Sequence, residues 1–396
     1  MKIILIISLA IILYTFIGYG ILLYVILKFN RLVYGKPDLR KSNNIVLPTC
    51  TLIVAAYNEQ AMMVEKISNT LALDYPAGQL KFIFVTDGST DQTPAIIARY
   101  PEITLLHQAK RDGKIAAVHR AINQVDTEVI VFTDANTMLN RTALIEICKH
   151  YTDPLIGAVA GEKRVHMDEA ADATAGEGFY WKYESKLKQW DSELYTVVGA
   201  AGELFSIRKK LYEPVPRDSV LDDFMISMRI VEKGYRIVYE PRAYATETAS
   251  LNITEELKRK VRISAGGIQS IIYLKGLLNI FRTPVLSFQY ISHRVLRWTI
   301  VPFLLILSFF INGIIAITDT NVFFRTLSVL QIVFYTLALI GWMMEKRQIR
   351  IKALFVPYYF CMMNYAVIAG IFRFFRGKQN VVWHKAERKQ SISVIS

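Results

Sequence analysis

A nearly uninterrupted apolar run from Ile3 to Leu27 constrains this chain more than any other feature. About 25 residues, at a helical rise of ~1.5 Å each, are enough to cross the ~30 Å hydrocarbon core of a bilayer. A signal peptide would have a shorter apolar region and a small-residue cleavage site, and neither is present here. We therefore expect residues 1–28 to form a transmembrane helix, with the lipid bilayer as a partner.

Three further apolar stretches are long enough to span a bilayer, at 300–318, 322–344 and 353–372. They predict C-terminal transmembrane segments over 299–376 and a basic tail over 377–396. Basic residues after the first span outweigh the single Lys2 before it, which places the following domain in the cytoplasm. We expect a multi-pass protein of the cell (inner) membrane. Three C-terminal spans would leave the basic tail outside, so either the last segment is re-entrant or the positive-inside rule fails here.

The composition limits the classes of partner and site. The net charge of +13 fits anionic lipid, a phosphorylated substrate or nucleic acid. Because basic residues crowd the flanks of the apolar runs, headgroup attraction explains them and no nucleic-acid partner is expected. The three cysteines form no Cys-x-x-Cys pair and the six histidines are scattered, which excludes a zinc site and a disulfide framework.

Short β-branched or apolar runs alternate with helical patterns across the middle of the chain. The strand-like runs are 51–56, 82–86, 103–106 and 129–133, and the clearest helical patterns are 62–73 and 115–125. This alternation predicts a wound α/β sheet over 45–262, which binds ligands at the carboxyl ends of its strands. Residues 263–298 mix Arg and His with aromatic and aliphatic residues, and this pattern favours amphipathic helices lying at the membrane interface.

Polar clusters follow two of the predicted strands. Ala56, Asn58 and Glu59 end the first strand and open a helix, where backbone amides and an acidic side chain can face a nucleoside. Asp87 follows the second strand and precedes a glycine. Asp91, a few residues on, is equally well explained as a cap of the helix that begins near Pro94.

Two further clusters suit a diphosphate. Lys110 and Lys114 flank a glycine at the start of a helix, where ammonium groups and helix-end amides together stabilise negative charge. A solvated basic loop is the alternative. Asp134 ends an apolar strand, and a carboxylate there can hold Mg²⁺ or Mn²⁺ because hard cations prefer oxygen ligands.

Together these four clusters resemble the family 2 glycosyltransferases of the α/β GT-A (Rossmann-like) fold, especially the processive membrane synthases of chitin oligosaccharide, hyaluronan, cellulose and poly-N-acetylglucosamine. The resemblance extends over nearly the whole chain. It implies that Asp87 contacts the nucleoside, that Lys110 and Lys114 contact the base or the diphosphate, and that Asp134 contacts the metal-bound diphosphate. The family's Asp-x-Asp motif is Asp134-Ala135-Asn136 here, so Asn136 offers the metal a neutral oxygen.

The resemblance also implies an acceptor segment and a catalytic pair. Gly199, Gly202 and Glu203 lie in a glycine-rich stretch like the one that contacts the acceptor in the family, although a tight turn explains the glycines equally well. Asp223 stands at the position of the catalytic base, and Asp222 stands where Glu is more usual. Asp222 also suits a helix cap.

The family's last motif, Gln-x-x-Arg-Trp, is degenerate. Only Arg262 remains, and an arginine there can neutralise a diphosphate. Ile263 replaces the Trp that helps to form the acceptor site in the family, and this leaves long-chain processivity in doubt.

The resemblance therefore predicts an inverting glycosyltransferase that uses a nucleotide sugar, with UDP-N-acetylglucosamine as the first choice. The acceptor is a polysaccharide or a lipid-linked sugar at the cytoplasmic membrane face, the cofactor is Mg²⁺ or Mn²⁺, and the product is a β-glycoside. A catalytically silent membrane protein that binds a nucleotide sugar as a regulator is the alternative. The sequence leaves any accessory subunit open.

Overall fold

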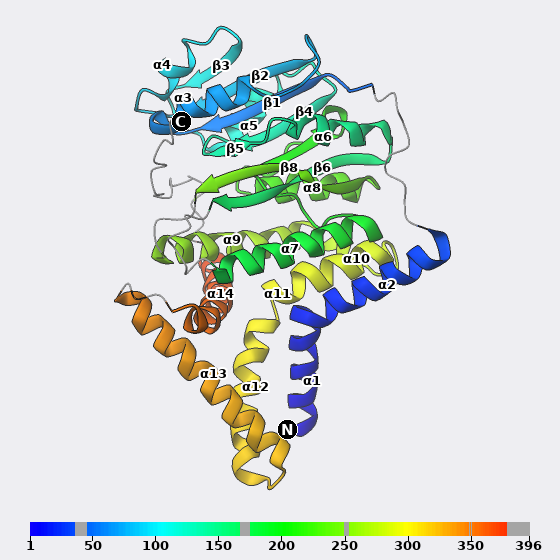
Figure 1. The fold of residues 1–396 in the computed structure, drawn as a ribbon, viewed down its shortest axis with the longest axis vertical. Helices are drawn as coiled ribbons and strands as arrows, with labels where there is room; N and C mark the ends of the chain where they lie inside the picture. Colours follow the sequence, from blue (N-terminus) through cyan, green and yellow to red (C-terminus); the bar gives the residue numbers. More distant parts are fainter. Residues whose placement is uncertain (36–45, 167–174, 249–252, 348, 350, 378–396) are drawn as a thin grey trace. The chain divides into compact units, whose positions relative to one another are not determined.

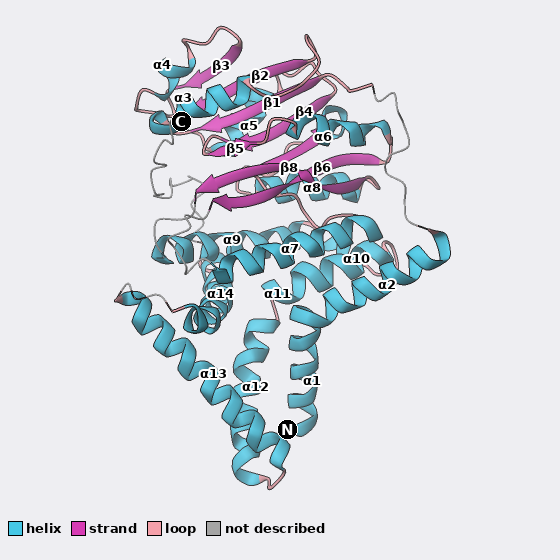
Figure 2. Cartoon of the chain, in the orientation of Figure 1, coloured by secondary structure: helices cyan, strands magenta, loops and turns pink. Residues whose placement is uncertain are grey.

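The computed structural model describes residues 1–35, 46–166, 175–248, 253–347, 349 and 351–377 (Figure 1). The chain divides into two compact units. Among the described residues, the helical unit comprises 1–29, 175–187, 253–347, 349 and 351–377, and the sheet unit comprises 30–35, 46–166 and 188–248. The described residues of the helical unit form helices and no strands, whereas the sheet unit is built on a β-sheet (Figure 2).

The sheet unit is organised around an eight-stranded mixed sheet with the order β3-β2-β1-β4-β7-β6-β8-β5. Strands β3, β2, β1 and β4 are parallel neighbours, while β7 runs antiparallel to both β4 and β6. Strand β8 is parallel to β6 and antiparallel to β5. The strands are β1 (Cys50–Ala56), β2 (Leu80–Asp87), β3 (Ile103–Gln108), β4 (Val129–Asp134), β5 (Thr137–Leu139), β6 (Ile156–His166), β7 (Leu204–Arg208) and β8 (Arg236–Thr248).

The central strands are apolar because they are buried on both faces. Every residue of β4 before Asp134 is buried, and β1 is buried except for Ala55. Continuous apolar runs of this kind are typical of the middle of a parallel sheet. Strands predicted at 51–56, 82–86, 103–106 and 129–133 are thus confirmed as β1 to β4.

Helices of the sheet unit connect these strands. They are α3 (Gln60–Leu71), α4 (Thr93–Ile97), α5 (Lys114–Ile122), α6 (Ala143–Cys148) and α8 (Asp222–Glu232), with 3₁₀ turns at Lys149–Thr152 and Lys209–Leu211. Helix α7 (Ala175–Leu194) has its first part in the helical unit and its last turns in the sheet unit. The helices predicted at 62–73 and 115–125 correspond to α3 and α5.

Four helical segments of the described residues are long and apolar enough to cross a membrane: Lys2–Tyr34, Val301–Thr318, Val322–Lys346 and Ala353–Phe375. The first consists of α1 (Lys2–Leu13), a π-helical turn (Tyr14–Gly18) and α2 (Tyr19–Tyr34), and the others are α12 (Val301–Thr318), α13 (Val322–Lys346) and α14 (Lys352–Phe375). All four predicted spans are therefore helices of the required length and apolarity.

The remaining helices of the helical unit include one long helix that crosses a predicted domain boundary. They are α9 (Ile253–Tyr273), α10 (Pro284–Tyr290) and α11 (Leu296–Trp298), with a 3₁₀ turn at Lys275–Leu278 and a π-helical turn at Ile291–Val295. The boundary expected between 262 and 263 falls inside α9. Residues 264–270 of α9 are all buried, and a Cβ on Gly370 would lie 2.6 Å from Ser264, so small residues let α9 and α14 approach closely. The predicted location of 263–298 at a membrane interface stays a prediction, and the tail 378–396 lies outside the described residues.

Candidate active site

The polar residues of the site meet at one edge of the sheet. Strands β1, β2 and β4 are parallel, so their carboxyl ends lie together: Ala56 is opposite Thr86, and Ala55 is opposite Asp134. Strand β7 is antiparallel to β4, with Leu204 opposite Thr133, so the stretch that precedes β7 reaches the same edge. The topology therefore brings Gly202 and Glu203 next to the end of β4.

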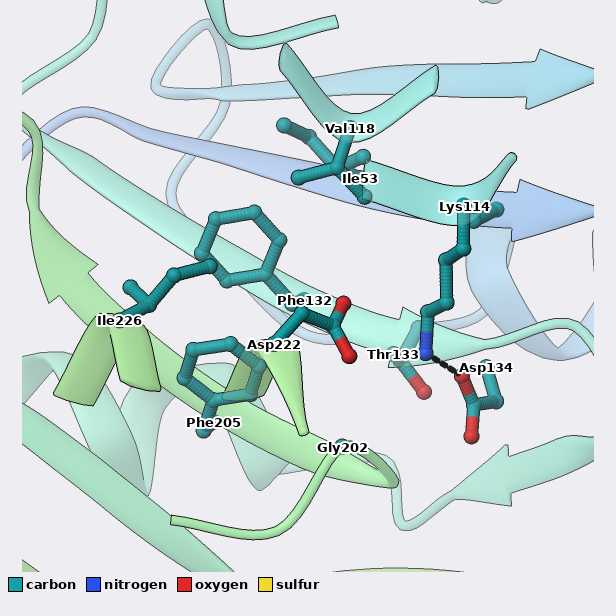
Figure 3. A pocket seen from close by; sticks show the side chains of 11 residues that line it. Ile53, Lys114, Val118, Phe132, Thr133, Asp134, Gly202, Phe205, Asp222 and Ile226 are labelled. Carbon is teal, nitrogen blue, oxygen red and sulfur yellow. Dashed lines mark hydrogen bonds and ion pairs between the residues drawn. The ribbon is translucent and has the colours of Figure 1, made fainter. Parts of the chain in front are cut away.

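A lysine and an aspartate from different elements form an ion pair in a pocket at this edge. Lys114 is the first residue of α5, and its Nζ lies 2.8 Å from Oδ1 of Asp134 at the end of β4 (Figure 3). Gly113, the residue before α5, has a φ of 98°, which a glycine adopts without strain. The pocket is lined by Ile53, Ala55, Lys114, Val118, Phe132, Thr133, Asp134, Gly202, Phe205, Asp222 and Ile226.

The two aspartates at the start of α8 border the same space. Figure 3 shows the Asp222 carboxylate among the residues that line the pocket. A Cβ placed on Gly202 would lie 3.2 Å from Oδ2 of Asp223 and 3.7 Å from Nζ of Lys114. Gly202 thus marks the point where the Asp223 carboxylate approaches the Lys114 ammonium, and any larger residue would enter the space between them.

Asp223 has the electrostatic setting of a general base. Burial and then the neighbouring charge of Asp222 raise the pKa of its carboxyl group to about 7, although Lys114 acts in the opposite direction. The Asp223 carboxylate accepts a hydrogen bond from the backbone N–H of Phe224 through Oδ1 (2.8 Å). A base whose pKa lies near neutral pH combines a useful unprotonated fraction with useful proton affinity.

Lys114 carries a firmly held positive charge. Burial alone would lower the pKa of Lys114, but the carboxylates of Asp134, Asp222 and Asp223 outweigh it and raise the pKa above its usual value. Around this single ammonium the pocket therefore gathers three carboxyl groups. A nucleoside diphosphate would be repelled by that balance of charge unless further cations accompany it.

The residues present fit a divalent cation that is shared with a substrate. Among the described residues, no three or more His, Cys, Asp or Glu side chains are arranged so that they could hold a metal ion by themselves. Mg²⁺ is commonly held by one or two carboxylates together with substrate phosphates. Asp134 provides one carboxylate, while Asn136 is buried in the turn after β4 and is not one of the pocket-lining residues.

Asp87 and Lys110, which were also predicted for the donor, are not pocket-lining residues, and both contact the loop that leads into α5. Oδ2 of Asp87 accepts hydrogen bonds from the backbone N–H groups of Asp112 (2.9 Å) and Gly113 (2.6 Å). Asp87 thereby fixes the loop that leads into α5. Lys110 in this loop has a side chain that is 82% exposed, and its Nζ lies 3.2 Å from Asp112. Their contacts with a donor remain predictions.

The loop after β1 is joined to the loop after β2. Asn58 has a φ of 53°, and its Oδ1 accepts a hydrogen bond from the backbone N–H of Thr90 (2.8 Å). The backbone N–H of Glu59 donates to Oγ1 of Thr93 (2.8 Å). Asp91 lies one residue before Gln92, the N-cap of α4, and its Oδ1 accepts a hydrogen bond from the backbone N–H of Thr93, the first residue of α4.

The predicted acceptor stretch has one residue with a clear packing role. Gly199 has a φ of 82°, and a Cβ there would lie 2.1 Å from the ring of Phe224, so Gly199 lets the chain pass against the start of α8. Glu203 directly precedes β7, and its charge raises the pKa of Asp223. Arg262 belongs to α9 in the helical unit, so its predicted donor contact remains a prediction.

Two buried lysines near this edge were missed by sequence reasoning. Lys163 of β6 lies 2.6 Å from Glu203 and also pairs with Glu247 of β8. Lys66 of α3 donates to the backbone carbonyl of Thr137 (2.7 Å). Lys163 could not be found because the pairing of β6 with β8 is not local. Lys66 did leave a signal, since Met63, Lys66, Ile67 and Thr70 follow the spacing of one buried helix face.

Comparisons with known proteins show which sequences and folds resemble this chain. A family model described as Glycosyl transferase family 2 matches residues 51–215. The poly-beta-1,6-N-acetyl-D-glucosamine synthase of Staphylococcus aureus (strain COL) is 27% identical over 241 residues, which are 59% of this chain and 57% of that relative. The synthase of the same name from Staphylococcus epidermidis is 24% identical over 266 residues, 65% of this chain and 62% of the relative. The match thus spans less than two thirds of each relative.

A solved structure shares the fold. The mannosyltransferase PcManGT from Pyrobaculum calidifontis, in complex with GDP-Man and Mn²⁺, has a TM-score of 0.70 at 22% identity, over 95% of this chain and 99% of that one. The predicted fold class is therefore confirmed. Residues 51–215 thus carry a glycosyltransferase family 2 domain, its sheet has a GT-A-like fold, and the chain also has helices apolar enough to span a membrane.

Proposed function

We propose that the chain is an inverting glycosyltransferase that moves a sugar from a nucleotide sugar to a polysaccharide or lipid-linked acceptor at the cytoplasmic membrane face. One observation carries this proposal. The Asp223 carboxyl group, suited to accept a proton, and the Lys114–Asp134 pair, suited to a diphosphate, approach each other at Gly202. A base and a charged site for the leaving group on either side of a small space are what a single displacement needs.

In this reaction Asp223 accepts the proton of an acceptor hydroxyl while that oxygen attacks the anomeric carbon of the donor. The bond between the anomeric carbon and the diphosphate breaks, and the electron pair leaves with the nucleoside diphosphate. Lys114 stabilises the negative charge that develops there. One displacement inverts the anomeric centre, so an α-linked donor yields a β-glycosidic bond.

A divalent cation, Mg²⁺ or Mn²⁺, completes the proposed donor site. Three carboxyl groups surround one lysine, so additional positive charge is required before a diphosphate binds favourably. Asp134 would hold the cation, with Asn136 as a second oxygen ligand by resemblance to the family. When bound, the cation neutralises charge on the diphosphate.

The relatives guide the choice of donor. Both are named for a polymer of N-acetylglucosamine, so UDP-N-acetylglucosamine is the donor that we propose to test first. The chain also resembles a structure solved with GDP-Man, and GDP-mannose therefore belongs in the same panel. Because the matched part is 57% of the first relative, the polymer-forming activity of that enzyme is not carried over with the donor.

Incubation of membranes containing the full chain with a panel of radiolabelled nucleotide sugars tests the proposal. Lipid-soluble and polymeric products are then separated. Asp223→Asn should reduce turnover at least ~10²-fold while donor binding stays nearly intact, because the substitution removes proton acceptance and keeps the shape. Asp126→Asn is the matched control, since Asp126 is exposed and precedes β4 at the opposite end from the pocket.

The outcomes separate the enzyme from a silent regulator. Product formed by the wild type and lost in Asp223→Asn supports the proposal. Turnover of Asp223→Asn within about tenfold of the wild type would refute the base assignment. Donor binding by the wild type without hydrolysis or transfer of any sugar in the panel would favour the regulatory alternative.

A further inference from the structure

One charged residue beside the pocket has no part in the proposed displacement. Lys66 lies in the middle of α3, and its side chain is completely buried. Its Nζ donates a hydrogen bond to the carbonyl oxygen of Thr137 (2.7 Å) and a longer one to Oγ1 of Thr133 (3.4 Å). No carboxylate in the part of the chain that the structure describes forms an ion pair with it.

A buried lysine without an ion-pair partner reduces the stability of the fold. Moving an ammonium group out of water without an ion-pair partner opposes folding, and an apolar residue of similar volume is often as stable or more so. Burial lowers the pKa of Lys66 to about 7, and the nearby charge of Asp134 opposes that shift. The negative charge that acts on Lys66 is therefore that of Asp134, the carboxylate of the proposed donor site.

Lys66 lies where two parts of the site are joined. Its partners, Thr133 and Thr137, bracket Asp134 along the chain, and Oγ1 of Thr137 donates to the backbone carbonyl of Asp134 (2.9 Å). Oγ1 of Thr133 donates to the backbone carbonyl of Glu203 (2.8 Å). One buried cation thus holds the turn that carries Asp134 and, through Thr133, the stretch that borders Asp223.

We propose that Lys66 is a positioning residue of the transfer site. Lys66 fixes the turn from Asp134 to Thr137 and places a positive charge near the Asp134 carboxylate. This inference rests on the proposed function. Lys66 does not touch the reacting atoms. Its charge lowers the electrostatic cost of bringing an anionic diphosphate to a pocket that holds three carboxyl groups, and its hydrogen bonds keep Asp134 in place.

The same helix provides a matched control. Asn69 lies one turn after Lys66, and its side chain makes two hydrogen bonds with the backbone of Leu139 in β5, at 2.8 and 2.9 Å. Asn69 therefore tethers the same segment to α3 without a charge. A purely structural role for Lys66 would make the two residues equivalent.

The experiment compares Lys66→Met and Asn69→Leu with the wild type as purified full chains in detergent. Calorimetry measures the Kd for UDP with Mn²⁺ present, electron paramagnetic resonance measures the Kd for Mn²⁺ with UDP present, and thermal unfolding gives the Tm. At about pH 6, where the Lys66 ammonium form dominates, Lys66→Met should weaken UDP binding about tenfold. Its Tm should be unchanged or higher. Asn69→Leu should lower the Tm and leave the Kd for UDP within about twofold.

The kinetic constants of Lys66→Met provide a second measurement. With the donor that the wild type uses, Lys66→Met should raise KM more than it lowers kcat, since Lys66 is placed outside the chemistry. UDP binding by Lys66→Met equal to that of the wild type, or an equal loss in both variants, would overturn the inference while the wild-type activity stands. Failure of the wild type to turn over any sugar is a separate result and overturns the proposed function as well.

Discussion

At the scale of single residues, the site depends on competing influences on Asp223. Burial and the charge of Asp222 favour the protonated acid, whereas Lys114 and the backbone N–H of Phe224 favour the carboxylate. The first pair prevails, and the pKa of Asp223 is about 7. A carboxyl group in water has a pKa near ~4 and is a weak base, so this balance gives Asp223 its capacity to accept a proton.

The pH dependence of the reaction follows from this balance. Activity requires unprotonated Asp223, so kcat/KM should fall as the pH decreases through about 7. Asp222→Asn removes a charge that raises the pKa of Asp223, and it should move this acid limb to lower pH with turnover retained. Initial rates across the pH range, at low donor concentration, measure the effect. A limb that stays in place in Asp222→Asn would contradict the coupling.

The proposed metal requirement depends on Asp134 and Asn136. Asp134→Ala should weaken donor binding and lower the rate, because it removes both the partner of Lys114 and the proposed cation ligand. Asn136→Asp adds a carboxylate and should keep activity or lower the Mg²⁺ or Mn²⁺ concentration that is needed. Titration of activity against each metal in a chelator-treated sample measures this. Full activity in excess chelator would show that cationic side chains suffice for the diphosphate.

At the scale of elements, the position of α8 decides where Asp223 lies. The start of this helix packs on Gly199, whose positive φ and contact with the Phe224 ring leave no room for a side chain. Oγ of Ser227, one turn into α8, accepts a hydrogen bond from the backbone N–H of Ala200 (3.0 Å). The glycine-rich stretch therefore anchors the helix that carries the proposed base.

Gly199→Ala should consequently affect both stability and catalysis. The Cβ would combine backbone strain with a clash against Phe224, and we expect a loss of about 2 to 4 kcal/mol of stability and a lower kcat. Gly234→Ala is the matched control, because Gly234 has a φ of 90° with nothing within 4 Å of the added Cβ. It should show only the strain, about 1 kcal/mol, with kcat unchanged. Thermal unfolding and initial rates compare the two, and equal effects would contradict the packing role.

Local sequence patterns predicted the strands and helices better than they predicted how these elements come together at the pocket. The runs at 51–56 and 129–133 were recognisable because strands buried on both faces consist of apolar residues. Lys114 and Asp134 were identified from residue types at strand and helix ends, whereas Asp223 was identified from the resemblance to the family. Their convergence depends on β7 lying antiparallel beside β4, which no local pattern encodes. The single helix α9 was divided because its buried face consists of small residues and gives a weak apolar signal.

Within the helical unit, one ion pair constrains which ends of the candidate membrane helices lie together. Lys2 at the start of α1 forms an ion pair with Asp319, between α12 and α13. Both ends of this pair belong to the helical unit, so the amino terminus and the connection between α12 and α13 lie on one side. If the amino terminus is outside, as its charge predicts, the segment after the first span is cytoplasmic.

Cysteine labelling tests this topology in intact cells. Cys50 and Cys148 are buried, and Cys361 is partly buried, so their background labelling should be low. If the amino terminus is outside, a membrane-impermeant maleimide should label Thr320→Cys in intact cells, because that exposed position lies in the connection between α12 and α13. Asp126→Cys should be labelled only after permeabilisation, because its exposed side chain belongs to the sheet unit. The reverse pattern would place the catalytic domain outside.

The hydrogen bond between Thr133 and the carbonyl of Glu203 joins positions that are 70 residues apart in the chain. The chain between them includes β6, which pairs with β7 and β8 in the same sheet. A direct contact therefore holds the stretch before β7 against the end of β4. The register between these two parts of the pocket thus does not depend on the length of the chain that connects them.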